Sequence, residues 1–133
     1  MAGCPVIWRS KLQTTVSTLT CEAEYAALFE ATKESAWIRS FLTELGHMPV
    51  GPIPILEENT GAIKWATDDA MTSGRRLVRI EYHYIVQEGR SKNIISRKVA
   101  SEDNAADGFT KPLSAESFKQ FIEKLGLKNG TSL

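Results

Sequence analysis

The sequence predicts an α/β domain in which helices pack on a sheet. Segments rich in β-branched residues alternate with segments of helical periodicity, in the order strand, helix, strand, helix, helix, strand, helix, helix. The chain has 133 residues, 42% of them hydrophobic, which is enough apolar material for one core. We therefore expect a single domain over residues 1–127, followed by a flexible tail over 128–133.

Composition excludes several classes of protein. Lys and Arg together number 16, as do Asp and Glu, so the chain as a whole carries no field that would attract a polyanion. Cys4 and Cys21 stand in no metal-ligand spacing. No run of about 20 apolar residues and no signal-peptide pattern occurs, so we expect an intracellular protein, cytoplasmic or nuclear, without a membrane segment.

The first two elements follow Pro5. The β-branched run from Val6 to Val16 predicts a strand that leads into a loop. A long amphipathic helix should begin near Thr20 or Cys21 and end at Gly46, with acidic residues in its first turn. Two apolar arcs lie along this helix: Tyr25, Leu28, Phe29 and Ala36, then Ile38, Phe41, Leu42 and Leu45.

The middle of the chain predicts a buried strand and two helices. Ile53 to Leu56 is short, apolar and bounded by Gly and Pro, as in a buried strand. A short helix should cover about Thr60 to Thr67, with a loop from Asp68 to Gly74. The spacing of four apolar residues then predicts a helix that stops near Gly89: Leu77, Ile80, Tyr84 and Ile85.

The last third predicts one strand and two helices. Asn93 to Val99 has the β-branched character of a third strand. A small helix should run from Asn104 to Phe109 and break before Pro112. Apolar residues spaced i, i+3, i+4 and i+7 from Phe118 predict a final helix with Ser114 as its N-cap.

Three acidic residues fall where an α/β layer brings side chains together. Glu24 lies in the first turn of the long helix, Glu58 at the end of a buried strand, and Asp107 in the small helix after the third strand. Clustered carboxylates repel one another unless a cation neutralises them, and Mg²⁺ is held by carboxylates and substrate phosphates. A two-metal phosphodiester hydrolase is one hypothesis. The alternative is that such acids only stabilise helix N-termini.

Several short motifs, in order, give the chain a resemblance to a known family. From about Ile7 to Leu127 it resembles the ribonuclease H domain that closes the Pol polyprotein of copia-type retrotransposons. The matching segments are Trp8-Arg9-Ser10-Lys11-Leu12-Gln13, Glu22-Ala23-Glu24-Tyr25-Ala26-Ala27-Leu28, Asn59 with Ala62-Ile63, Tyr82-His83-Tyr84-Ile85, Glu102-Asp103, and Ala106-Asp107 with Thr110-Lys111-Pro112-Leu113.

The resemblance implies a metal-dependent nuclease of ribonuclease H-like fold. Four carboxylates of the family hold two Mg²⁺ ions, which activate water and stabilise the leaving oxygen as the RNA strand of an RNA–DNA hybrid is cut. The helix, strand-end and final acids of the family fall on Glu24, Glu58 and Asp107. Glu22 belongs to the same helix motif, but two residues correspond to about 200° of helix, so it should face elsewhere.

Departures from the family pattern predict a degenerate site. The chain begins at the family's third strand, so the expected fold lacks the first β-hairpin, and with it one metal-binding Asp, from a mixed sheet with flanking helices. Glu58 stands where the family has Asp, and the extra methylene displaces a carboxylate in a site where Mg²⁺ demands near-ideal geometry. We therefore expect weak Mg²⁺ binding or none, and no catalysis by the chain alone.

A missing hairpin predicts a sheet edge that needs a partner. We expect a homodimer, or a partner protein, at this open edge, with Trp8 and Trp37 as partner-binding residues. One alternative is an Mg²⁺-dependent ribonuclease H completed by another chain. Another is a non-catalytic binder of an RNA–DNA hybrid or another nucleic acid, because residues 73–98 hold seven basic and two acidic side chains, including Arg75, Arg76, Arg79 and Lys98.

Overall fold

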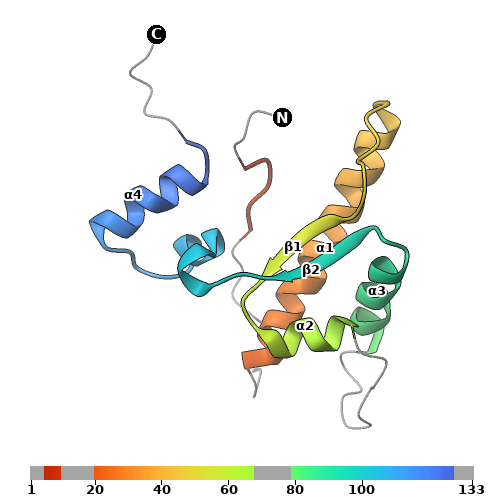
Figure 1. Cartoon of the computed structure of the whole chain (residues 1–133), viewed down its shortest axis with the longest axis horizontal. Coiled ribbons are helices and arrows are strands. Elements are labelled where there is room, and N and C mark those ends of the chain that lie inside the picture. The colour runs from red at the N-terminus through yellow and green to blue at the C-terminus, as the bar shows by residue number, and fades with distance from the viewer. Residues whose placement is uncertain (1–4, 10–19, 68–78, 128–133) are drawn as a thin grey trace. The chain divides into compact units, whose positions relative to one another are not determined.

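The computed structural model describes residues 5–9, 20–67 and 79–127. It has α/β architecture: the described part holds four α-helices and a two-stranded parallel sheet (Figure 1). The chain divides into two compact units, one of residues 15–100 and one of residues 1–14 with 101–133. The larger unit contains three helices and both strands: α1 (Thr20–Glu44), β1 (Ile53–Glu57), α2 (Thr60–Thr67), α3 (Arg79–Arg90) and β2 (Ile94–Lys98).

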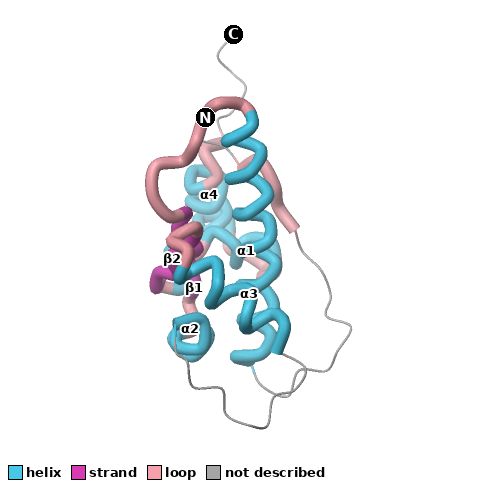
Figure 2. The backbone as a smooth tube through the Cα atoms, turned by 90° about the vertical axis from the view of Figure 1, so that its right-hand side faces the viewer, coloured by secondary structure: helices cyan, strands magenta, loops and turns pink. Residues whose placement is uncertain are grey.

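The two strands bury one face against the helices. They pair in parallel with Ile53 opposite Ile94 and Glu57 opposite Lys98. Within β1, exposure alternates, so that Ile55 and Glu57 are buried while Pro54 and Leu56 are exposed. Figure 2 shows α1 and α3 side by side next to the strands, and α1, α2 and α3 all contact one another. The buried face of the β1–β2 pair therefore forms one side of the core, and the helices α1, α2 and α3 form the other.

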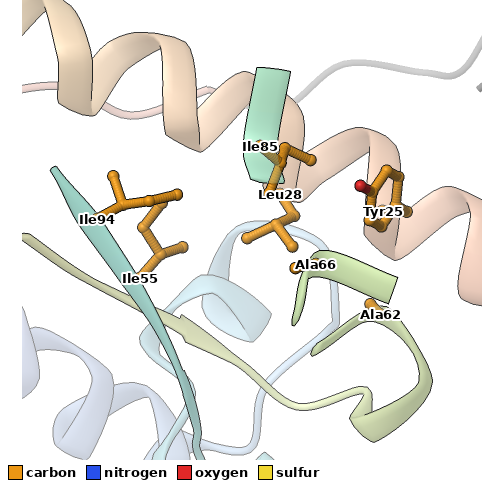
Figure 3. Packing of buried hydrophobic residues seen from close by; sticks show 7 residues of the cluster. All are labelled: Tyr25, Leu28, Ile55, Ala62, Ala66, Ile85 and Ile94. Carbon is orange, nitrogen blue, oxygen red and sulfur yellow. The ribbon is translucent and has the colours of Figure 1, made fainter. Parts of the chain in front are cut away.

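The core of the larger unit is small and comes from every one of its elements. Its buried members, shown in Figure 3, are Tyr25, Leu28, Ile55, Ala62, Ala66, Ile85 and Ile94. The Trp65 ring packs edge-on against Tyr25, with 5.7 Å between the ring centroids. On α1 the buried residues end at Thr32, whose hydroxyl donates to the Leu28 carbonyl. Only the N-terminal half of this helix thus contributes buried side chains.

The smaller unit is a short helical hairpin. It contains η2 (Ser101–Asp103), η3 (Ala105–Phe109) and α4 (Ala115–Lys124), with Asn104 and Ser114 as N-caps. Phe109 of η3 packs edge-on against Phe121 of α4 at 5.1 Å between centroids. A Cβ on Gly108 would meet the Phe121 ring at 2.3 Å, so this close approach requires glycine.

Most predicted elements are confirmed to within about two residues, and several details are wrong. Residues 6–9 form no strand, and the rest of the predicted 6–16 strand lies outside the described residues. The two described strands pair in parallel, and the mixed sheet stays a prediction because residues 10–19 lie outside the described part. Ile80 is 82% exposed, because α3 buries Ile85 and Val86 instead. The predicted loop 68–74 and Leu77 lie outside the described residues.

The C-terminal apolar arc of α1 is not buried as an amphipathic pattern would predict. Phe41 and Leu45 are about half exposed, and Ile38 and Leu42 are only partly buried.

No helix in the described ranges is long and apolar enough to cross a membrane.

Candidate carboxylate site

The junction between β1 and α2 is held by three short-range hydrogen bonds to the side chains of Asn59 and Glu57. The Asn59 amide oxygen accepts hydrogen bonds from the backbone N–H groups of Gly61 (2.8 Å) and Ala62 (3.3 Å), as an N-cap does at the start of a helix. The Glu57 carboxylate accepts the Asn59 backbone N–H at 2.8 Å. These hydrogen bonds therefore hold the turn between the end of β1 and the start of α2 in one backbone conformation.

Glu57 is the buried acid of this junction. It is 5% exposed, because strand alternation places it on the same face as Ile55. Burial raises the pKa of Glu57, the Asn59 hydrogen bond partly offsets that rise, and the nearby Glu24 and Glu58 carboxylates raise the pKa further. The acids belong to elements that contact each other, because α1, which carries Glu24, packs against β1, which ends at Glu57.

Glu58 follows Glu57 and is only partly buried. Its Oε2 atom is buried and has no hydrogen-bond partner among the described residues. Its carbonyl oxygen accepts a hydrogen bond from the Lys98 ammonium at 2.8 Å. Lys98 is one of the four predicted nucleic-acid contacts. In the structure its ammonium group binds the backbone at the end of β1.

Two of the three predicted site acids lie in the larger unit, and the third lies in the smaller one. Asp107 of η3 forms an ion pair with Lys111 at 2.6 Å, and the Ser101 hydroxyl lies 3.4 Å from the same carboxylate oxygen. Across residues 5–9, 20–67 and 79–127, no group of three or more His, Cys, Asp or Glu side chains is arranged to hold a metal ion.

Glu57 is the acid that sequence reasoning missed. The predicted set names Glu58, because that position matches the family motif. The signal for Glu57 was present in the strand itself, because alternation from Ile55 directs the side chain two residues later to the same buried face.

The remaining predicted site residues are three arginines expected to bind nucleic acid and two tryptophans expected to bind a partner. Arg75 and Arg76 lie outside the described residues, and Arg79 begins α3 with a side chain outside them. Trp8, in the smaller unit, is 67% exposed. Trp37 is 55% exposed and stacks on Phe41, with centroids 5.4 Å apart and rings within 6° of parallel.

Comparisons with known proteins show similarity to retrotransposon polyproteins. The chain is 35% identical over 123 residues, 92% of its length, to the retrovirus-related Pol polyprotein from transposon RE1 of Arabidopsis thaliana. It is 34% identical over the same length to that from transposon RE2 of the same plant, and 29% identical over 126 residues to that from transposon TNT 1-94 of Nicotiana tabacum.

The chain is therefore homologous, over nine tenths of its length, to a segment of retrotransposon Pol polyproteins. It spans less than a tenth of the length of these relatives: 8% of the two Arabidopsis proteins and 9% of the tobacco protein. No protein-family model and no solved structure matches the chain.

Proposed function

We propose that this chain is a ribonuclease H-like domain of retrotransposon descent that does not cleave nucleic acid by itself and acts by self-association. The fold assignment is supported by the ordered motifs and by homology to Pol polyproteins. The observation that carries it is the contact between α1, which holds Glu24, and β1, which ends at Glu57 beside Glu58, because it brings the helix motif and the strand-end motif together as the resemblance implies.

The inactivity proposal is supported by the state of the individual acids. Glu57 occupies the buried position at the end of β1, where burial favours its protonated form, and it is engaged with Asn59. Asp107 is already neutralised by Lys111. Glu58 carries one methylene more than the Asp of the family, in a site whose metal tolerates little displacement.

Self-association is supported by apolar side chains that the larger unit leaves exposed. One set lies on the outward face of the strand pair, where Leu56 is 58% and Ile95 39% exposed. A second set lies on the C-terminal half of α1. A domain whose stability is only about 5–15 kcal/mol gains from covering such surface.

The purified full chain should leave the RNA strand of a labelled RNA–DNA hybrid intact in either Mg²⁺ or Mn²⁺. The physical reason is that Glu57 is buried, Asp107 is paired with Lys111, and Glu58 stands where the family has Asp. A gel assay of strand length, with an active ribonuclease H as positive control, measures this. Cleavage that Asp107→Asn abolishes would contradict the proposal, because it would show that the chain's own acid supports hydrolysis.

A second candidate function is Mg²⁺-dependent hydrolysis of the RNA in a hybrid when another chain completes the site. It is favoured by the buried Glu58 oxygen that lacks a partner among the described residues, since carboxylate oxygens are the ligands Mg²⁺ prefers. Glu24 and Glu58 of the larger unit would hold the ion, which would supply water activation. Calorimetry that shows two tight Mg²⁺ sites in the full chain would favour this candidate. For an inactive domain we expect no Mg²⁺ binding, or one weak site with a dissociation constant of roughly millimolar.

A further inference from the structure

We propose that the turn between α3 and β2, residues 89–92 and called here the α3–β2 turn, contacts the phosphodiester backbone of a nucleic acid (Figure 1). All four of its residues are exposed: Gly89, Arg90, Ser91 and Lys92. Two of the side chains are cations and one is a hydroxyl, and such groups commonly contact phosphate oxygens in nucleic-acid complexes. The inference goes beyond the proposed self-association and does not depend on it.

Lys92 has a backbone conformation that residues with side chains rarely adopt. Its φ is +57°, and no other non-glycine residue within 5–9, 20–67 and 79–127 has a positive φ. The Lys92 N–H donates to the Gly89 carbonyl, and the Asn93 N–H donates to the Glu88 carbonyl, both at 3.0 Å. These two hydrogen bonds form a Schellman motif at the end of α3, in which glycine is the usual residue at the position of Lys92.

Two other helices of this chain end in the same motif and have glycine at that position. At the end of α1, Gly46 has a φ of +78°, and at the end of α4, Gly126 has a φ of +66°. A side chain at such a position strains the backbone, and strained residues concentrate at functional sites. The lysine at the end of α3 therefore points to a role for its side chain.

Attraction between a cation and the helix dipole does not account for this lysine. The last turn of α3 already contains Arg90, which supplies a cation at the negative end of the helix. The last turn of α4 likewise contains Lys124, yet α4 ends with Gly126. Two helices with the same cation in the last turn thus differ at the strained position, and Lys92 stands at the exposed one of the two strands' ends.

The α3–β2 turn holds Lys92 in a fixed place. The Asn93 side-chain amide donates to the Glu88 carboxylate at 2.9 Å, and the Ile53 N–H donates to the Asn93 carbonyl at 2.9 Å, which ties the turn to β1. Within the described part of the chain, no hydrogen bond or ion pair engages the Lys92 ammonium. A cation on a fixed backbone loses less freedom on binding than one on a mobile loop.

The chemistry of the turn suits a nucleic acid better than a protein. Residues 89–92 include no apolar side chain, whereas protein interfaces have apolar centres and are depleted in lysine. A Cβ on Gly89 would meet nothing within 4 Å, so the backbone there is open to a ligand. Residues 73–98, which include the turn, hold seven basic and two acidic side chains.

This contact is separate from the candidate carboxylate site. The parallel pairing places Glu57, the last residue of β1, opposite Lys98 at the far end of β2. Lys92 precedes Lys98 by six residues, which correspond to about 20 Å of extended chain. Loss of the Lys92 charge therefore leaves the surroundings of the acids unchanged.

The test is the binding of a labelled RNA–DNA hybrid to full-length variants, measured by fluorescence anisotropy over a range of salt concentrations. Lys92→Gly and Lys92→Asn remove the charge with residues that accept a positive φ, so both should fold. Each should weaken binding by about five- to tenfold at about 0.1 M salt and reduce the salt dependence by about one counter-ion. Lys92→Arg should bind as the wild type does.

Lys119→Asn, at an exposed lysine of α4, is the matched control for loss of one positive charge and should leave binding unchanged. Equal effects of Lys119→Asn and Lys92→Asn, or no effect of either, would overturn the proposal, as would a wild-type chain that does not bind the hybrid. Poly-glutamate that binds as tightly as the hybrid, with the same loss in Lys92→Gly, would assign the turn to an acidic protein instead. None of these outcomes bears on self-association, which sedimentation measures independently.

Discussion

Leu28→Ala should destabilise the larger unit by about 2–5 kcal/mol, the usual cost of deleting a fully buried leucine. Leu28 is 1% exposed and belongs to a core that has seven buried members, two of them alanines. The loss is a large part of a stability of about 5–15 kcal/mol. Urea unfolding followed by far-ultraviolet circular dichroism measures the change.

Val50→Ala provides the control for the deletion, because Val50 lies in the same unit and is fully exposed. We expect it to change the free energy of unfolding by less than about 0.5 kcal/mol. Equal effects of the two substitutions would show that the core described for the larger unit does not hold it together.

Glu57→Gln should stabilise the chain at neutral pH by about 1–3 kcal/mol, the scale of an imperfectly compensated buried polar group. The glutamine keeps an oxygen for the Asn59 N–H but removes the charge that burial and the neighbouring carboxylates disfavour. Because the folded pKa of Glu57 lies above its unfolded value, the folded chain binds the proton more tightly. Stability from this group is therefore full below the unfolded pKa and falls as pH rises through the folded pKa.

Urea midpoints measured from mildly acidic to neutral pH test this sign. The wild-type midpoint should fall relative to that of Glu57→Gln as pH rises. Glu44→Gln, at an exposed carboxyl of α1, should follow the wild type. A Glu57→Gln variant less stable than wild type at neutral pH would mean that the ionised carboxylate contributes favourable contacts.

Elements with strong local signals were predictable from the sequence. The predicted Ser114 cap begins α4 at Ala115, through a contact that spans only three residues. The helix α2 begins at Thr60 as predicted, although its Asn59 cap was not named in advance. Ile80 shows the limit of such reasoning, because its spacing suited a buried stripe while α3 turns Ile85 and Val86 inward. The face of a helix that becomes buried depends on elements distant in the sequence that pack against it. The spacing of apolar residues within the helix does not contain that information.

The sequence motifs predicted which segments contribute to the candidate site, but they did not predict how the side chains of those segments are placed. The helix acid Glu24 and the strand-end acids do share a neighbourhood, as the order of elements implied. Matching the motif position selected Glu58, whereas the strand pleat selects Glu57 for the buried face. Asp107 and Lys111 both stand in a matched motif, but the motif does not predict the ion pair that they form.

Sedimentation equilibrium of the unmodified full chain at micromolar concentration tests the central claim most directly. The account predicts a species of twice the 14.7 kDa chain mass that dissociates on dilution, because self-association would cover apolar side chains that the larger unit leaves exposed. A well-folded species of 14.7 kDa at every concentration would contradict it, because the chain would then not function by self-association.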